Sequence, residues 1–154
     1  MLERLTAGSD RVTTRAVVEE IKNGVAAYPD LQDVLDLAWL SVVSADSLDE
    51  LRLFAKYAAR LGSGIHDVGE ASVLAWAEAH GAIAFTDDEA AVQAGRDEGV
   101  EVRRTLGVVA RGIKLGVFSD VDADRLIDEL LRAGGRFPFG AGEFVQWARE
   151  NGLV

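Results

Sequence analysis

Short apolar runs alternate with longer stretches of helical periodicity along this chain. Strands are predicted where apolar residues run together, and helices where apolar residues recur every three or four positions. The predicted strands are 10–14, 38–43 (a buried one), 82–86 and 100–104. The predicted helices are 14–27, 30–37, 47–62, 69–80, 87–99, 105–116, 120–135 and 142–151, and residues 1–7 are predicted to end a helix that Gly8 closes. The alternation predicts an α/β three-layer sandwich with a short, mostly parallel sheet.

The helix at 47–62 has the clearest local signals at both of its ends. Ser47 precedes the apolar periodicity and Glu50 follows three residues later, which is the spacing of a capping box. Gly62 follows the last periodic residue and is typical of a helix terminator. These signals predict a helix between Ser47 and Gly62.

Composition narrows the class of protein. A chain of 154 residues with 49% hydrophobic and 27% charged residues is typical of one globular domain, predicted here to span 1–154. The absence of cysteine excludes disulfides and thiolate metal sites within this sequence. Met1 is followed by charged residues and no apolar run reaches the length of a membrane span, so we expect a soluble, cytoplasmic protein without a signal peptide.

The charge of the chain restricts its partners. A formal net charge of −10 argues against a stand-alone binder of duplex DNA, because such proteins cover phosphates with cations. Three explanations of the negative charge remain: a basic protein partner, a metal site built from carboxylates, or solubility alone.

Acidic residues follow the predicted strand 82–86. Asp87 and Asp88 come directly after Thr86, at the carboxyl end of a parallel strand, where α/β proteins bind ligands. A capping box formed by Thr86 and Glu89 explains those two residues without any chemistry. It explains Asp87 and Asp88 less well, because three adjacent acids repel one another unless a positive charge lies among them. The pattern therefore favours either a helix cap or a divalent-metal site.

Glu20 is a second candidate. In the helix after the first strand, apolar residues recur every fourth position from Val17, and Glu20 borders this stripe whereas Glu19 points into water. An acid beside a buried face, near the carboxyl end of a strand, is a plausible metal ligand. The alternative is an ion pair of Glu20 with a nearby arginine such as Arg11 or Arg15.

Glu70 has a good structural explanation. Asp67 and Glu70 have the spacing of a capping box, and a carboxylate in the first turn of a helix is favoured by the helix dipole. If these acids hold a metal, hard oxygen ligands indicate Mg²⁺ or Mn²⁺. One or two such ions can activate water for the in-line hydrolysis of a phosphodiester.

Three arginines complement the acids. Arg103 and Arg104 end the strand 100–104, and Arg111 lies seven residues after Arg104, hence on the same helix face. At the carboxyl edge of the sheet they would hold phosphates. The alternative for each of them is an ordinary surface arginine near acids such as Asp97 or Glu98.

In their order and spacing, three segments resemble the PIN-domain nucleases. The segments are VTTRAVVEEI, GEASVLAWAEAHGAIAFTDDEAAVQAGRDEGVEV and RTLGVVARGIKLGVF. The likeness is to the branch of predicted nucleic-acid-binding proteins related to the VapC-type ribonuclease toxins. It covers roughly residues 10–136, and 137–154 would be a helical extension at the C-terminus.

The resemblance implies roles for the acids. It implies that Glu20, Glu70 and Asp88, with Asp87 beside them, ligate magnesium or manganese for endoribonuclease chemistry. It also implies RNA as the substrate and a toxin–antitoxin pair. From the net charge we expect a basic protein as the antitoxin, and we also expect a homodimer.

One feature of the family is missing. PIN domains open with a central apolar strand that ends in an aspartate, whereas MLERL resembles the helix after that strand. We therefore expect nuclease activity to be impaired in this form. We also expect either an upstream extension of roughly 15–30 residues that encodes the strand, or an obligate dimer.

Two other functions are alternatives to the nuclease. The first is an interaction or dimerisation module with the same fold and no catalysis. The second is a receiver-like phospho-acceptor domain, which needs a lysine at the end of a late strand. Thr86 and Arg104 occupy the corresponding strand ends, which argues against a receiver.

Overall fold

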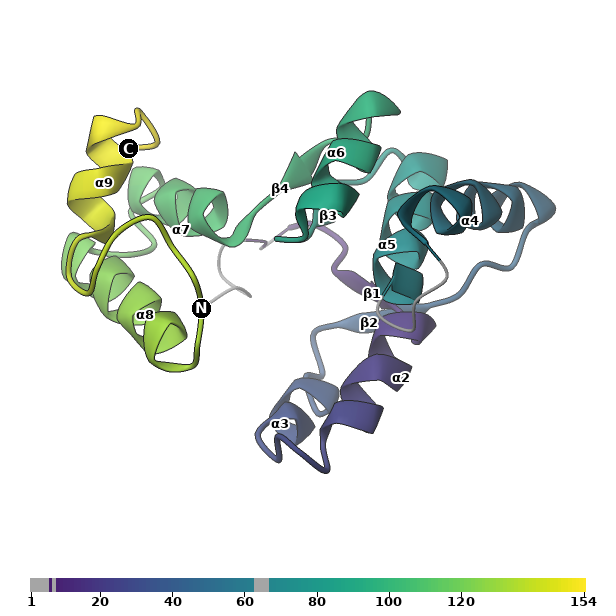
Figure 1. Cartoon of the computed structure of the whole chain (residues 1–154), viewed down its shortest axis with the longest axis horizontal. Helices are drawn as coiled ribbons and strands as arrows, with labels where there is room; N and C mark the ends of the chain where they lie inside the picture. Colours follow the sequence, from purple (N-terminus) through teal and green to yellow (C-terminus); the bar gives the residue numbers. More distant parts are fainter. Residues whose placement is uncertain (1–5, 7, 63–66) are drawn as a thin grey trace. The chain divides into compact units, whose positions relative to one another are not determined.

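The structure, a computed structural model, describes residues 6, 8–62 and 67–154. It forms two compact units, residues 8–103 and residues 104–154, the second of which includes Thr6. The first unit contains β1 (Val12–Thr14), α2 (Arg15–Gly24), α3 (Leu31–Leu35), β2 (Ser41–Val43), α4 (Leu48–Leu61), α5 (Asp67–His80), β3 (Ala84–Phe85), α6 (Glu89–Asp97) and β4 (Val102–Arg103) (Figure 1). The second contains α7 (Thr105–Lys114), α8 (Asp120–Arg132) and α9 (Phe144–Glu150).

The strands are short, parallel and arranged in pairs. β1 pairs with β2 in a register that places Val12 opposite Ser41, and β3 pairs with β4 with Ala84 opposite Val102. The α/β class with parallel strands is confirmed, but in the described part of the chain the strands form two two-stranded sheets and not one. Both β1 and β3 pack against α5, so this helix supports one strand of each sheet.

Helix α5 is the centre of the first unit. Its apolar residues are not confined to one face, as expected for a helix covered on several sides. Four of its small or apolar side chains are buried: Ala71, Leu74, Ala75 and Ala77. Helix α4 packs along it, and the fully buried Tyr57 of α4 donates a hydrogen bond of 2.6 Å to Glu78 of α5. The buried phenol is thereby hydrogen-bonded, which offsets the cost of removing it from water.

The second unit has a hydrophobic core of its own. It is built by α7, α8 and α9 around the fully buried Ile127 and Phe144. Its other buried members are Val109, Ala110, Phe118, Ala123, Val145 and Ala148. None of the helices in the described ranges is long and apolar enough to span a membrane.

The helix predicted at 47–62 is confirmed together with its caps. The Ser47 hydroxyl accepts a 3.2 Å hydrogen bond from the backbone N–H of Glu50, and the Glu50 carboxylate accepts one of 2.7 Å from the backbone N–H of Ser47. Gly62 ends α4 with a φ of 118°, which a residue with a side chain rarely adopts.

Two sequence predictions are corrected here. The strand predicted to be buried at 38–43 is shorter, and Ser41 and Val42 are exposed because β2 lies at the edge of its sheet. Asp67 is the first residue of α5 and not the residue before it, so Asp67 and Glu70 do not have the positions that the predicted capping box requires. The helix predicted at 1–7 lies outside the described residues apart from Thr6.

Candidate metal centre at the strand ends

Glu20 reaches from α2 to the first turn of α5. Its carboxylate accepts a 3.0 Å hydrogen bond from the backbone N–H of Gly69. A Cβ atom at position 69 would lie 2.4 Å from one Glu20 carboxylate oxygen, so only glycine permits this approach. The N-terminus of a helix attracts negative charge, and Glu20 has this contact instead of the arginine partner considered above. Glu19 instead faces solvent and pairs with Lys22 at 2.8 Å, as predicted from the helical phase.

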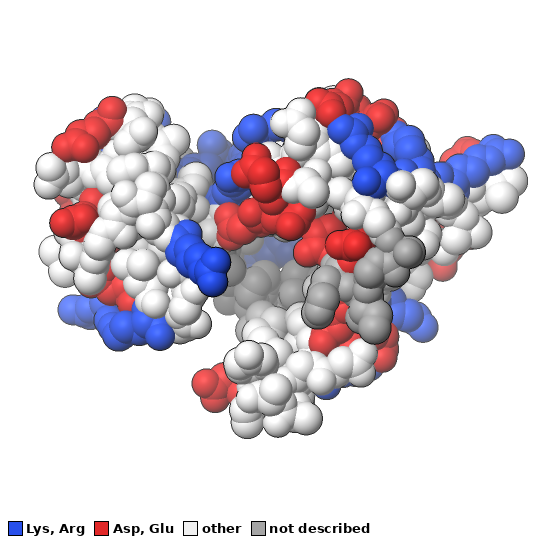
Figure 2. Space-filling view, viewed as in Figure 1, with Lys and Arg blue, Asp and Glu red and all other residues white. Residues whose placement is uncertain are grey.

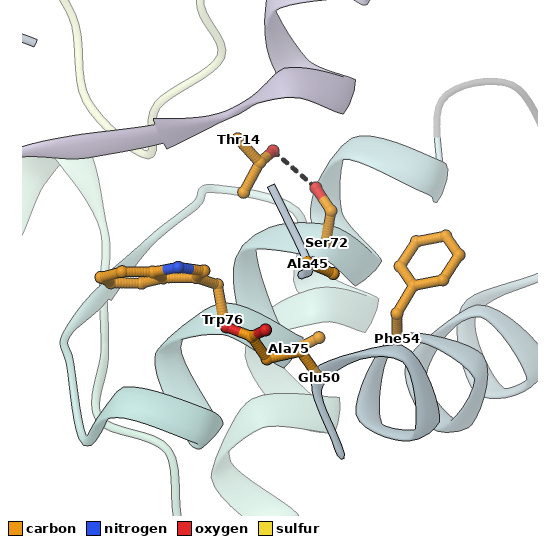
Figure 3. Close-up of a pocket in the computed structure, with 7 residues that line it drawn as sticks. All are labelled: Thr14, Ala45, Glu50, Phe54, Ser72, Ala75 and Trp76. Atoms are coloured by element: carbon orange, nitrogen blue, oxygen red, sulfur yellow. Dashed lines mark hydrogen bonds between the residues drawn. The ribbon is translucent and has the colours of Figure 1, made fainter. Parts of the chain in front are cut away.

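A chain of hydroxyl groups fixes β1 against the same turn of α5. Thr14 is buried, and its hydroxyl lies 2.6 Å from the hydroxyl of Ser72 beside a small cavity of about 30 Å³ (Figure 3). Ser72 donates its single hydrogen to the carbonyl of Gly69 at 2.7 Å, so Thr14 is the donor of the hydroxyl–hydroxyl bond. The end of β1, the start of α2 and the first turn of α5 are thus held together at the position of Glu20.

The surroundings of Glu70 disfavour its charged form. One of its carboxylate oxygens, Oε2, is buried and accepts no hydrogen bond from any described residue. Burial raises the pKa of Glu70 above its ordinary value, and the negative charges of Glu20, Asp88 and Asp67 raise it further, against a lowering by its own backbone N–H. Figure 2 shows acidic side chains gathered over α6 and beside α5. The four acids therefore form one electrostatic cluster.

Asp88 caps helix α6. Its carboxylate accepts a 2.8 Å hydrogen bond from the backbone N–H of Ala91, while the Thr86 hydroxyl accepts one of 3.2 Å from the backbone N–H of Asp88. The predicted capping box of Thr86 with Glu89 is therefore wrong, and Asp88 is the capping residue. Asp87 is exposed and lies two residues after the end of β3. The cap gives Asp88 a structural role, but the hydrogen bond uses only one of its two oxygens.

The positions and chemistry of these carboxylates show how well they fit the divalent cation that the family resemblance implies. In the described ranges, no three acidic or histidine side chains are close enough together to form a metal-binding group. Two of the carboxylates point their oxygens at helix N-termini, Glu20 at Gly69 and Asp88 at Ala91. The donor chemistry nevertheless fits a hard divalent cation, since all the groups are carboxylates and Glu70 offers a buried oxygen without a hydrogen bond.

The arginines are distributed over both units. Arg103 belongs to the first unit and is paired with Glu101, its Nε lying 2.8 Å from the carboxylate. The side chain is therefore partly neutralised within β4. Arg104 and Arg111 belong to the second unit, and the grouping of all three arginines with the acids stays a prediction.

Sequence reasoning missed part of this cluster. The sequence pattern indicates only a capping role for Asp67, whereas its negative charge also raises the pKa of Glu70. The roles of Gly69 and of the Thr14–Ser72 pair depend on contacts between positions 49 and 58 residues apart. The signal that could have found them is the quartet GEAS, in which a glycine beside an acid permits close approach of another side chain.

Parallel strands alternating with helices define an α/β protein, a class in which ligands commonly bind outside the carboxyl ends of the strands. The chain belongs to the PIN-domain family, because the model of that family (DUF3368) matches residues 1–140. The match extends across both units. No curated protein and no solved structure matches the chain.

Proposed function

We propose that this protein is a metal-dependent ribonuclease of the PIN type. Glu20, Glu70 and Asp88 would hold Mg²⁺ or Mn²⁺, with Asp87 beside them. The observation that carries the proposal is the buried, unpaired Oε2 of Glu70 among three other carboxylates. A carboxylate in such a place is destabilised by its neighbours, and a bound cation would remove that repulsion.

Each of the three carboxylates would contribute one oxygen to the cation. Glu70 would contribute the oxygen that has no partner within the protein, and Glu20 and Asp88 would each contribute the oxygen that their helix-capping bonds leave available. A bound divalent cation supplies Lewis-acid activation of water and neutralises phosphate charge. In the hydrolysis, the oxygen of water attacks phosphorus and one ester P–O bond of the RNA backbone breaks.

The partners follow from the family and the charge. PIN domains act on nucleic acid, and RNA is the substrate we propose, with Arg103, Arg104 and Arg111 as the phosphate contacts. The net charge of −10 fits a basic protein partner, such as the antitoxin of a toxin–antitoxin pair in the cytoplasm. A homodimer is part of the same proposal.

A second candidate function is a non-catalytic interaction module. It is favoured by the capping bonds of Glu20 and Asp88, which give both residues a structural purpose, and by the lack of a preformed three-ligand group in the described ranges. In that case the acids would stabilise helix termini and bind no ion.

Cleavage of a single-stranded RNA tests the proposal. We expect cleavage by the purified chain in millimolar Mn²⁺, none in EDTA, and loss of activity in Glu70→Gln. The matched control is Glu19→Gln, whose side chain lies on the same helix as Glu20 but pairs with Lys22 in solvent. Equal cleavage by Glu70→Gln and wild type would overturn the proposed site, and no cleavage together with no effect of Mn²⁺ on stability would favour the interaction module.

A further inference from the structure

A second concave site lies in the first unit, and none of its lining residues belongs to the carboxylate cluster. It has a volume of about 370 Å³, within the range of pockets that bind small molecules. Its lining comes from the segment that leads into β1, the turn before β2 and the middle of α5. The lining residues are Ser9, Asp10, Arg11, Val12, Trp39, Ser41 and Trp76.

The pocket is unusually rich in tryptophan. The chain has three tryptophans, and Trp39 and Trp76 both line this pocket. Both are only half-buried, and neither is among the described core residues of the unit. Trp147, by contrast, packs against Phe139 in the second unit at 5.0 Å between ring centroids. Both indole rings thus contribute apolar, partly exposed surface to the wall of the pocket.

The two indole rings are held in place by their neighbours. The Arg11 guanidinium lies 5.6 Å from the ring centroid of Trp39, a cation–π contact. The ring of His80 stacks on Trp76 at 4.2 Å and is itself hydrogen-bonded to Glu50 at 2.7 Å. Because the rings are already positioned, little conformational freedom would be lost when a planar ligand stacks on them.

The other residues that line the pocket indicate which class of ligand it would bind. Ser9, Asp10 and Ser41 are exposed and offer hydroxyl and carboxylate groups to the amino and imino edges of a planar ring. Arg11, whose guanidinium lies over Trp39, adds positive charge beside the pocket. Aromatic faces, an arginine and hydrogen-bonding groups at the rim are the combination with which proteins bind unpaired nucleobases.

The pocket shares its supporting elements with the carboxylate cluster. Trp76 lies six residues after Glu70 on α5, which is about 9 Å along the helix axis. Val12 lies two residues before Thr14 on β1, about 7 Å along the strand. Six residues also turn the helix to a direction about 120° away, so a single strand of nucleic acid with a base in the pocket would pass round α5 to reach the acids.

We propose that this tryptophan pocket binds a nucleobase of single-stranded RNA beside the cleavage site. The choice of RNA rests on the proposed function, but binding of the base needs no metal and no catalysis. Specificity for the unpaired base would come from Trp39 and Trp76, and the carboxylates would act on the backbone of a neighbouring nucleotide.

Tryptophan fluorescence in EDTA tests the pocket directly. The full chain carrying Trp147→Phe, so that only the two pocket tryptophans emit, is titrated with a mixed-sequence RNA hexamer. We expect saturable quenching, a dissociation constant raised about 5- to 150-fold by Trp39→Leu, and much less change in Trp39→Phe, which keeps a stacking ring. Ser41→Tyr would fill the pocket from an exposed position on the edge strand β2, and it should also abolish binding. Thermal unfolding of each variant checks that it is folded.

The outcomes separate this inference from the proposed function. Absence of saturable quenching, or equal affinity in Trp39→Leu and Trp39→Phe, overturns the pocket assignment. Quenching by an apolar hexapeptide and not by RNA also overturns it, and assigns the pocket to peptide. Tryptophan-dependent RNA binding without cleavage in Mn²⁺ supports the pocket and contradicts only the nuclease.

Discussion

The acids of the carboxylate cluster differ in how well their charges are stabilised by hydrogen bonds. Glu20 and Asp88 accept hydrogen bonds from helix N-termini, which stabilises their charge. Glu70 in the same cluster has a buried oxygen without such a bond. Helix capping explains Glu20 and Asp88, but it does not explain the buried oxygen of Glu70. This oxygen is the basis of the proposed cation site.

The contact between Glu20 and Gly69 gives a first prediction. A methyl group at position 69 would push the end of the Glu20 side chain away from the backbone N–H of Gly69. In EDTA, Gly69→Ala should therefore lose a hydrogen bond of about 0.5–1.5 kcal/mol, which offsets the helical preference of alanine, and its free energy of unfolding in urea should stay below that of Gly107→Ala. Gly107→Ala is the matched control, because nothing lies near its added methyl group in α7 and alanine favours a helix by about 0.5–1 kcal/mol. Equal stability of the two variants would contradict the close approach.

The pH dependence of stability gives a second prediction, which concerns Glu70. Its pKa is raised in the folded state, so its ionised form destabilises the protein. This cost is absent well below the ordinary value of 4.5, grows as the pH rises through the folded-state pKa, and is complete above it. In EDTA at pH 7, Glu70→Gln should therefore melt at a higher temperature than wild type.

The same comparison at low pH serves as the control. Near pH 4 the wild-type carboxyl is largely protonated, so the advantage of Glu70→Gln should disappear. A variant that is less stable than wild type at both pH values would show that the Glu70 carboxylate is not strained by its surroundings.

At the level of elements, the sequence predicted helices better than their connections. Helix α4 was predicted with its caps because Ser47, Glu50 and Gly62 act on neighbouring positions. The start of α6 was predicted two residues early, because Thr86, Asp87 and Asp88 all suit a helix N-terminus and only the fold selects Asp88. The strands were overestimated in length, because pairing with a distant partner and not local preference determines where each ladder ends.

The cap of α6 gives a third prediction. Asparagine is as good an N-cap as aspartate, so Asp88→Asn should unfold thermally within about 1 °C of wild type in EDTA. Asp88→Ala leaves the backbone N–H of Ala91 without its partner and should lose about 1 kcal/mol, or about 2–4 °C. If Asp88→Asn is as unstable as Asp88→Ala, the carboxylate charge and not the cap stabilises α6.

At the scale of the whole molecule, the family assignment spans more of the chain than either compact unit. The sequence order of strands and helices was sufficient to predict a parallel α/β fold, because short apolar runs and amphipathic helices alternate. The separation of the strands into two pairs was not predicted, since it depends on backbone hydrogen bonds between distant segments. The upstream strand, the dimer and the single-domain organisation stay predictions.

Binding of Mn²⁺ to the intact chain tests the central claim most directly, because it does not depend on catalysis. An ion that binds only the folded state at about 100 times its dissociation constant adds roughly 2.7 kcal/mol, which is a rise in melting temperature of about 5–10 °C for this chain length. Thermal unfolding with and without millimolar Mn²⁺ should show this rise in wild type and in Glu19→Gln. The rise should be smaller in Glu20→Gln and absent in Asp88→Asn, which keeps its cap. No shift in wild type, or an undiminished shift in Asp88→Asn, would contradict the cation site.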